Sequence, residues 1–261
     1  MKEKTKKRER QFFDHSFEFG TREPVSKFYT VTKGSRKYYE DFLLSNCYNR
    51  RVLEYGCGTG SFAFSLSQHD AEVTGIDISE VAIKLAKAQA RKVGSENPNF
   101  LMMDAEDMQF EDSSFDIVCG TAILHHLDVD KALREVARVL KPEGTAIFVE
   151  PLGHNPVINL FRKLTPSLRT KDEHPLVNRD FSLAKKFFYQ ADYRFFSLSS
   201  LLAVPFRNSR GFSSLLNRLD DLDKRAFGWA PLLKLLAWQV VIVLKKPRKA
   251  QLEWYAQGVR L

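Results

Sequence analysis

The sequence predicts an α/β fold built on a doubly wound, mostly parallel sheet, and two observations lead to that class. Short apolar segments alternate with amphipathic segments of helical period over residues 51–150, which is typical of βαβ units with right-handed crossovers. The first apolar segment runs into Gly56, Gly58 and Gly60, where missing Cβ atoms permit a sharp turn and bring bare backbone close to a ligand. The 261 residues, 44% of them apolar, suffice for one domain with a buried core.

Each expected element has a local reason. Apolar segments of strand length, separated by turn residues, predict strands at 52–53, 71–76, 99–103, 115–120, 145–150, 193–204 and 238–244. Apolar residues at helical spacing predict helices at 36–46, 61–68, 80–92 and 181–191, and one from Asp128 or Asp130 to near Leu140. Ser79 is the expected N-cap of the third of these helices, and Gly94 ends it. The first helix is expected to lie on the sheet and to roof the ligand.

Acidic residues follow the second and third expected strands. Asp77 stands close to the ~20-residue spacing at which an acid meets ribose hydroxyls. The corner Asp104-Ala105-Glu106 suits an adenine edge. A dinucleotide site would share the first acid, but its pattern asks for Gly or Ala where this chain has Ser61. The order of strand, glycines and acids therefore predicts a nucleotide-like cofactor.

With these residues in place, the sequence resembles the class I S-adenosylmethionine-dependent methyltransferases, in particular the branch similar to the quinone-biosynthesis enzymes. The matching segments are 54–60, Asp77, Asp104-Ala105, 115–127 and 133–144. An ordered set of this kind is far more specific than a single motif. The resemblance implies a Rossmann-like fold with a seven-stranded, mostly parallel sheet in which the last strand is antiparallel.

The resemblance also implies S-adenosyl-L-methionine as the cofactor and a set of residues around it. The expected cofactor-binding residues are Glu54, Gly56, Cys57, Gly58, Gly60, Asp77, Ile78, Asp104, Ala105, Glu106 and Thr121. Glu54 is expected to order the loop or to engage the amino group through water, Asp77 to hold the ribose diol, and Asp104 to meet adenine.

Two histidines are the candidate catalytic residues. His125 and His126 stand on the turn after the fourth expected strand, which the resemblance marks as active-site lining. A hydroxyl or protonated amine acceptor must lose a proton, and histidine titrates near neutrality. A purely structural role for the pair stays open, as does a core or pocket position for Phe28, Tyr29 and Tyr38.

Two segments are expected to select the acceptor. Residues 151–180 leave the carboxyl end of the fifth strand, where open α/β sheets bind ligands, and they carry His154, Arg169 and Glu173 among other polar residues. Residues 205–237 are basic and leucine-rich. The expected boundaries are 1–35 for a basic N-terminal segment, 36–246 for a single methyltransferase domain with lid insertions at 151–180 and 205–237, and 247–261 for a C-terminal tail.

The predicted function is methyl transfer to a small-molecule acceptor, with an apolar or lipid-linked acceptor as one option. The intact glycines and acids favour an enzyme over an inactive cofactor-binding or scaffolding protein of the same fold, which stays open. A nucleic-acid methyltransferase ranks third, because the net charge of +8 is spread along the chain beside acidic residues. Residues 120–123 also lack the Asp/Asn-Pro-Pro-Tyr/Phe signature of amino-methylating enzymes.

Composition predicts the cellular setting. Cys47, Cys57 and Cys119 have no paired or metal-ligand spacing, so we expect no metal site and a reducing, cytoplasmic environment. No apolar signal segment follows the charged residues 1–10, which are expected to be solvated and frayed. Peripheral contact with a membrane stays open, because leucines at 232–236 adjoin lysines.

Overall fold

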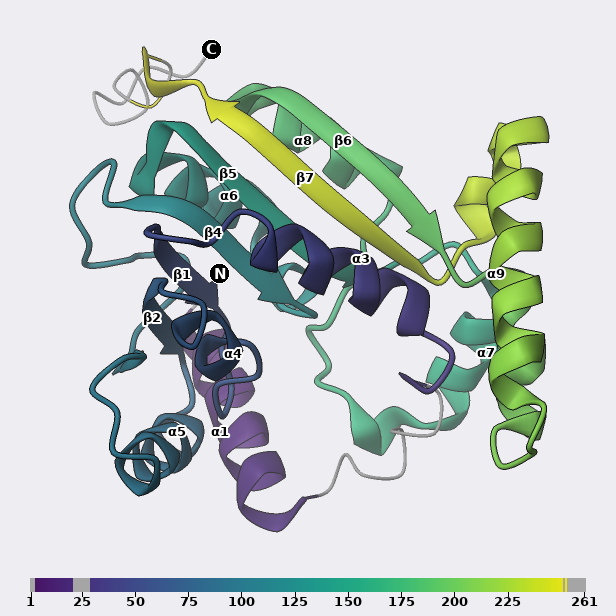
Figure 1. The fold of residues 1–261 in the computed structure, drawn as a ribbon, viewed down its shortest axis with the longest axis horizontal. Coiled ribbons are helices and arrows are strands. Elements are labelled where there is room, and N and C mark those ends of the chain that lie inside the picture. Colours follow the sequence, from purple (N-terminus) through teal and green to yellow (C-terminus); the bar gives the residue numbers. More distant parts are fainter. Residues whose placement is uncertain (1–2, 21–28, 251, 253–261) are drawn as a thin grey trace.

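The computed structural model describes residues 3–20, 29–250 and 252 and arranges them around a seven-stranded sheet (Figure 1). The strand order is β3-β2-β1-β4-β5-β7-β6. The strands are β1 (Arg51–Tyr55), β2 (Glu72–Asp77), β3 (Asn99–Met102), β4 (Phe115–Thr121), β5 (Leu140–Pro151), β6 (Phe188–Phe196) and β7 (Gln239–Pro247). Strand β7 pairs antiparallel with β5 and β6, whereas the pairs among β1 to β5 are parallel. The predicted fold class is confirmed.

Helices cover both faces of the sheet. The α-helices are α1 (Glu3–Phe19), α3 (Lys33–Leu44), α4 (Ala63–Ser67), α5 (Glu80–Lys92), α6 (Val129–Val139), α7 (Pro156–Leu164), α8 (Asn178–Phe187) and α9 (Phe212–Trp229). Short 3-10 helices are η2 (Leu124–His126), η3 (Pro166–Leu168), η4 (Ser199–Phe206) and η5 (Pro231–Leu236). One core joins Tyr39 of α3, Leu66 of α4 and Ile83 of α5, and another joins Leu133 of α6 to Phe187 of α8. A parallel sheet covered in this way has strands that are apolar on both faces.

Helix caps explain why two helix starts were predictable. The Ser79 hydroxyl accepts a hydrogen bond from Ala82 N at 3.1 Å, and α5 begins at the next residue. Asp128 caps α6 in the same way, accepting from Lys131 N at 3.4 Å. This contact decides between the two starts that the sequence offered.

The chain from 181 to 204 was predicted wrongly. Helix α8 ends at Phe187 and β6 begins at Phe188, whereas the helix was expected to reach 191 and the strand to run over 193–204. Phe188 lies opposite Pro247 of β7, and residues 199–206 form η4. Closely spaced aromatic residues suit either element locally, so pairing with a strand distant in the sequence decides the boundary.

Helix α1 replaces the frayed terminus that was expected at residues 1–10. Within the part of this segment that is described, Glu9 is only 3% exposed, and α1 packs against α5. Asp14 Oδ1 fixes the contact by accepting hydrogen bonds from Ser79 Oγ at 2.6 Å and Val81 N at 3.2 Å. The N-terminal segment is therefore part of the folded structure.

The two predicted insertions are also folded. Residues 151–180 supply α7, η3 and the start of α8, and residues 205–237 supply α9 and η5. Helices α7 and α9, which lie together in Figure 1, share a small core that includes Ile158 and Leu216. Among the described helices, none is both long and apolar enough to cross a bilayer. Phe28 and most of the tail predicted at 247–261 lie outside the described residues.

Candidate functional site

A cavity of about 210 Å³ lies at the carboxyl ends of β1 to β4. Its walls come from the glycine loop after β1, the residues that follow β2 and β3, the turn after β4, and α1. The lining residues are Glu9, Phe13, Phe17, Gly56, Gly58, Thr59, Ser61, Ile76, Asp77, Ile78, Met103, Asp104, Ala105, Thr121, Ala122, Ile123, His126 and Leu127. We call it the first cavity.

The glycine loop folds back on β2 and also packs closely against the side chain of Ile123. Gly56 N and Cys57 N both donate hydrogen bonds to Ile76 O at 2.9 Å. Gly56 has φ +72°, and a Cβ on it would lie 2.7 Å from the Ile123 side chain. A side chain here would meet both backbone strain and a steric clash, so the loop requires glycine at this position.

Glu54 organises the loop from below. Its carboxylate oxygens accept hydrogen bonds from Phe62 N at 2.9 Å and Ala63 N at 3.0 Å. Burial raises the pKa of Glu54 to about 8, although these two N–H groups act in the opposite direction. Glu54 thus positions the start of α4 and lies outside the described lining of the first cavity.

The two acids that follow β2 and β3 lie in the first cavity, where each already holds local backbone. Asp77 accepts from Gly58 N at 2.9 Å and from Ser79 N at 2.8 Å, and burial raises its pKa. Asp104 accepts from Glu106 N at 2.8 Å and also from Lys6 Nζ of α1. The carboxylates are fixed in place and face the same cavity.

Tyr55 supports the acidic corner from the core. The ring is completely buried, and the hydroxyl donates a hydrogen bond to Ala105 O at 2.6 Å. Glu106 is not among the described lining residues of the first cavity, and its Oε1 accepts from Asp128 N at 2.8 Å. Tyr55 and Glu106 therefore hold the loop after β3 to the rest of the fold.

Helix α1 roofs the first cavity, a role the sequence assigned to the helix at 36–46. That helix, α3, packs on β5 and β7. Phe13 and Phe17 of α1 line the cavity instead, and a Cβ on Gly58 would lie 3.2 Å from the Phe17 ring. The spacing of these two aromatics by one helical turn was a signal that could have been found in the sequence.

The histidine pair lies where β4 ends. His125 Nδ1 is 2.7 Å from Glu150 Oε2, and Glu150 also accepts from Ile123 N and Leu124 N. Burial raises the pKa of Glu150 to about 7. His126 Nδ1 is 3.2 Å from Glu9 Oε2 of α1. Each imidazole therefore has a buried carboxylate beside it, a contact that can hold a ring in one orientation.

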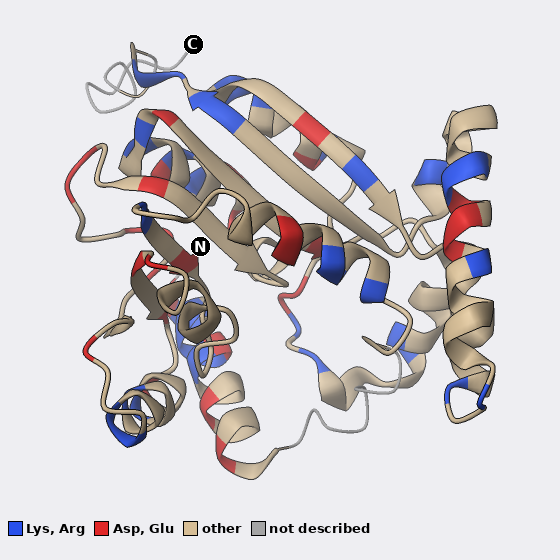
Figure 2. Ribbon diagram, in the orientation of Figure 1, with Lys and Arg blue, Asp and Glu red and all other residues tan. Residues whose placement is uncertain are grey.

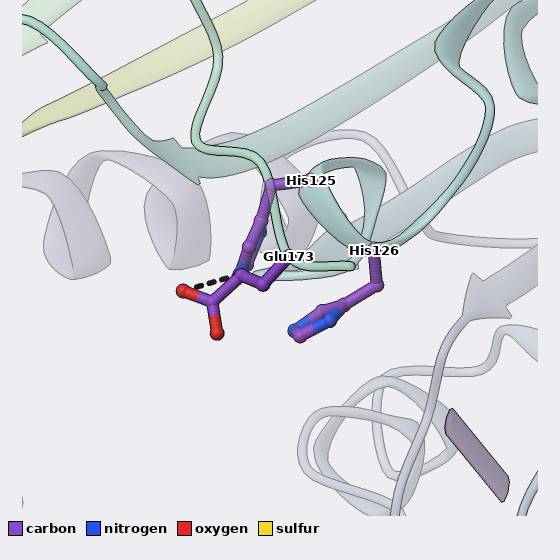
Figure 3. Close-up of side chains that lie close together, drawn as sticks. All are labelled: His125, His126 and Glu173. Atoms are coloured by element: carbon purple, nitrogen blue, oxygen red, sulfur yellow. Dashed lines mark ion pairs between the residues drawn. The ribbon is translucent and has the colours of Figure 1, made fainter. Parts of the chain in front are cut away.

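Glu173 completes this cluster from the segment after η3. Figure 3 shows its carboxylate beside the His125 ring, with Oε1 4.0 Å from His125 Nε2. One ligand atom from each of the three side chains falls within 4.8 Å of the others. This donor set is of a kind that could hold a metal ion, although the sequence predicted none.

A second cavity of about 60 Å³ adjoins the first at Ala122, which lines both. Ala122 has φ +54° and its N–H donates to Val149 O at 2.8 Å. The lining residues of the second cavity are Tyr29, Ala122, His125, Pro151, Ile158, Phe161, Arg162, Leu168, Arg169, Glu173, Trp238 and Gln239. Residues 151–180, the segment expected to contact an acceptor, thus supply much of its wall.

The structure brings only part of the predicted site together. The predicted residues that line the first cavity are Gly56, Gly58, Asp77, Ile78, Asp104, Ala105, Thr121 and His126. The predicted residues that lie behind it or beside it are Glu54, Cys57, Gly60, Glu106 and His125. Cys57 is fully buried in the core, and a Cβ on Gly60 would lie 2.8 Å from the Phe64 ring, so both positions serve packing.

The lining of the first cavity fits S-adenosylmethionine. Asp77 offers a buried carboxylate to a ribose diol, Ile78 and Ala105 offer apolar surfaces to an adenine ring, and Asp104 offers an acceptor for an amino group. At Gly58, only the missing Cβ leaves room between the loop and the ring of Phe17. The chemistry and the space of this cradle match the cofactor.

Known proteins resemble this chain in the same region. Residues 53–148 match the methyltransferase-domain family. An uncharacterized methyltransferase of Bacillus subtilis, YcgJ, is 40% identical over 113 residues, which are 42% of this chain and 45% of that protein. The demethylmenaquinone methyltransferase of Lactococcus lactis is 31% identical over 139 residues, 52% of this chain and 54% of that protein. This chain therefore spans about half the length of the curated relatives it matches.

Solved structures show the same fold. Phosphoethanolamine N-methyltransferase 2 of Haemonchus contortus, solved with phosphomonomethylethanolamine and S-adenosylhomocysteine, superimposes with a TM-score of 0.66 at 19% identity. The match covers 92% of this chain and 60% of that one. The structural similarity thus extends beyond the matched family region to most of the chain.

Proposed function

We propose that this protein is an S-adenosylmethionine-dependent methyltransferase acting on a small molecule, because residues 53–148 match the methyltransferase-domain family and the sheet resembles that of solved methyltransferases. One observation carries the proposal: the glycine loop, Asp77 and Asp104 face a single cavity at the carboxyl ends of the parallel strands. Open α/β sheets bind ligands at this edge. The alternative of an inactive cofactor-binding protein shares the cavity, so the two must be separated by turnover.

The residues of the first cavity divide the work of binding. Asp77 holds the ribose diol, Asp104 meets the adenine edge, and the backbone at Gly56 and Gly58 approaches the methionine portion. When bound, the sulfonium cofactor supplies an activated methyl group, so the protein needs no covalent intermediate. The walls formed by α1 exclude water and hold an acceptor in line, and such positioning contributes much of the rate in reactions of this type.

His126 is the proposed general base. Its side chain lines the first cavity, and Glu9 Oε2 lies 3.2 Å from Nδ1. A carboxylate this close to the ring stabilises the imidazolium that forms when a ring nitrogen takes a proton. His125 faces the second cavity beside Glu150. Its proposed role is to position the turn after β4, not to accept the proton.

The acceptor enters from the second cavity in this proposal. The two cavities adjoin at Ala122, so an acceptor held by α7 and the segment after it would present its nucleophile toward His126. Figure 2 shows basic and acidic residues interspersed over the helices and strands. This distribution supports a small acceptor rather than a nucleic acid, which a continuous basic surface would attract.

Calorimetry with S-adenosylhomocysteine tests the binding half of the proposal. We expect one molecule to bind per chain; absence of binding would contradict the proposal. Incubation with methyl-labelled cofactor and a host metabolite extract, followed by mass spectrometry, tests turnover. A product one methyl heavier supports an enzyme, whereas binding without any such product favours the scaffold.

Exposed apolar residues favour a lipid-linked acceptor among the possible small molecules. The Trp229 side chain at the end of α9 is 94% exposed and Leu232 of η5 is 80% exposed, with Lys234 close by in the sequence. Such side chains insert into the headgroup region of a bilayer while lysine attracts anionic lipids. Replacement of Trp229 and Leu232 by Ser should reduce co-sedimentation with anionic vesicles. The control Val93→Ser, at an exposed site at the end of α5, should not.

A further inference from the structure

The second cavity holds more positive than negative side-chain charge. Arg162 and Arg169 both line it, and the carboxylate among its lining residues is that of Glu173. Glu173 Oε1 lies 3.5 Å from Arg169 Nη1. One guanidinium therefore faces a largely apolar wall without a carboxylate of its own among the described lining residues.

Both guanidinium groups keep hydrogen-bonding capacity. Arg162 Nη1 donates to Leu152 O and to Asn159 Oδ1, each at 3.0 Å. Arg169 stacks over the Phe161 ring at 5.6 Å and reaches Thr165 Oγ1 at 3.4 Å. In each residue the Nε atom is buried and has no hydrogen-bond partner within the described part of the chain. A buried donor without a partner lowers the stability of the fold. Both Nε–H groups could therefore donate to a ligand.

We infer that the second cavity is an anion subsite, in which Arg162 and Arg169 hold an oxyanion, a carboxylate or a phosphate, of the methyl acceptor. The inference rests on the proposed function and names the chemical class of its substrate. A guanidinium offers a planar fork that matches such oxyanions. Bound at this place, the charged group would anchor the acceptor while its nucleophile reaches past Ala122 toward the first cavity.

The energetics of Arg162 agree with this assignment. Burial lowers the pKa of Arg162 to about 10; the charge of Glu173 acts against this shift and the charge of Arg169 adds to it. An anion between the two residues would relieve both effects, since buried charges need partners. The same two charges disfavour a metal ion at His125, His126 and Glu173, because the Glu173 oxygen nearest His125 is already shared with Arg169.

Thermal unfolding in sodium phosphate, against sodium chloride of equal ionic strength, tests the subsite without any knowledge of the acceptor. At about ten times Kd, phosphate should raise the Tm of the wild-type protein by about 3 °C. The double variant Arg162→Met, Arg169→Met should lose this shift. The control double variant Arg210→Met, Arg218→Met, which removes two exposed arginines and so the same charge, should keep it, and an equal shift in the two double variants would overturn the inference.

Two further variants protect the test against misfolding. Arg169→Met alone leaves the hydrogen bonds of Arg162 intact and should reduce the shift by at least half. Arg162→Lys keeps the charge without the fork and should give an intermediate response. Each variant is first shown to bind S-adenosylhomocysteine as the wild type does, so failure of the subsite and failure of the cofactor site are read separately.

Vesicles and cobalt complete the experiment. Binding to phosphatidic acid vesicles but not to phosphatidylcholine vesicles, abolished in the Arg162→Met, Arg169→Met double variant, would identify a lipid headgroup as the source of the anion. A phosphate response without vesicle binding would identify a soluble acceptor. A stoichiometric Co²⁺ absorption band that disappears in Glu173→Gln would overturn the inference in favour of a metal centre.

Discussion

Glu54 and Glu150 are two buried carboxylates with the same local task in different halves of the site. Glu54 accepts backbone N–H groups from Phe62 and Ala63 behind the cofactor loop. Glu150 accepts them from Ile123 and Leu124 and in addition lies against the His125 ring. The first only shapes a loop, whereas the second also orients an ionisable side chain. Under the proposed function, this difference separates a binding half, at β1 to β3, from a reacting half, at β4 and β5.

Loss of His126 should give the largest effect on turnover, and this effect should be confined to the reacting half. His126→Ala should lower kcat by about 10²- to 10⁴-fold, the range for removal of a general base, while the Kd for S-adenosylhomocysteine changes little. Steady-state kinetics with an identified acceptor, together with calorimetry, measures both. The exposed His69→Ala is the control, and unchanged turnover in His126→Ala would reject the base.

A side chain at Gly56 should disrupt the binding half. Gly56→Ala places a Cβ 2.7 Å from Ile123 at φ +72°, so we expect a loss of about 2 to 4 kcal/mol in the free energy of unfolding. Gly94 has a similar φ of +67° with nothing within 4 Å of its Cβ position. Gly94→Ala should therefore cost about 1 kcal/mol in urea denaturation, and equal losses in the two variants would show that the contact with Ile123 is unimportant.

Asp77 tests binding without the clash. Asp77→Ala should weaken S-adenosylhomocysteine binding by about 1 to 3 kcal/mol, because hydrogen-bonding groups are left unpaired. Calorimetry gives the two dissociation constants, with the exposed Glu143→Ala as the matched loss of one carboxylate. Wild-type affinity in Asp77→Ala would show that Asp77 does not hold the ribose.

The pH dependence of stability should distinguish the role of Glu54. The pKa of Glu54 is about 8 in the folded protein and 4.5 ordinarily. Between pH 4.5 and pH 8, the folded state therefore keeps a proton that the unfolded state has released. Stability contributed by Glu54 is thus complete below pH 4.5 and is lost as the pH rises toward 8. Glu54→Gln should flatten this decline by about 1 to 3 kcal/mol in urea denaturation across that range; parallel curves would contradict the assigned pKa direction.

The sequence predicted the binding half far better than the reacting half. Gly56, Asp77 and Asp104 follow strands at fixed spacing, so local pattern was enough to place them on one edge. The contact of Glu9 with His126 and the wall formed by Arg162 join segments that are distant in the chain, and no local pattern carries such a contact. The misplaced boundary near Phe188 has the same origin, since pairing with β7 decided it.

The ion pair between Lys6 and Asp104 has a consequence for timing. Together with the packing of Phe17 over Gly58, it fastens the first helix across the mouth of the cradle. Under the proposed function, a cofactor held in the first cavity could leave only after α1 moves away from Asp104 and Gly58, so release would cost the contacts that α1 makes there. The same contacts would set both the affinity for the cofactor and the rate at which it leaves.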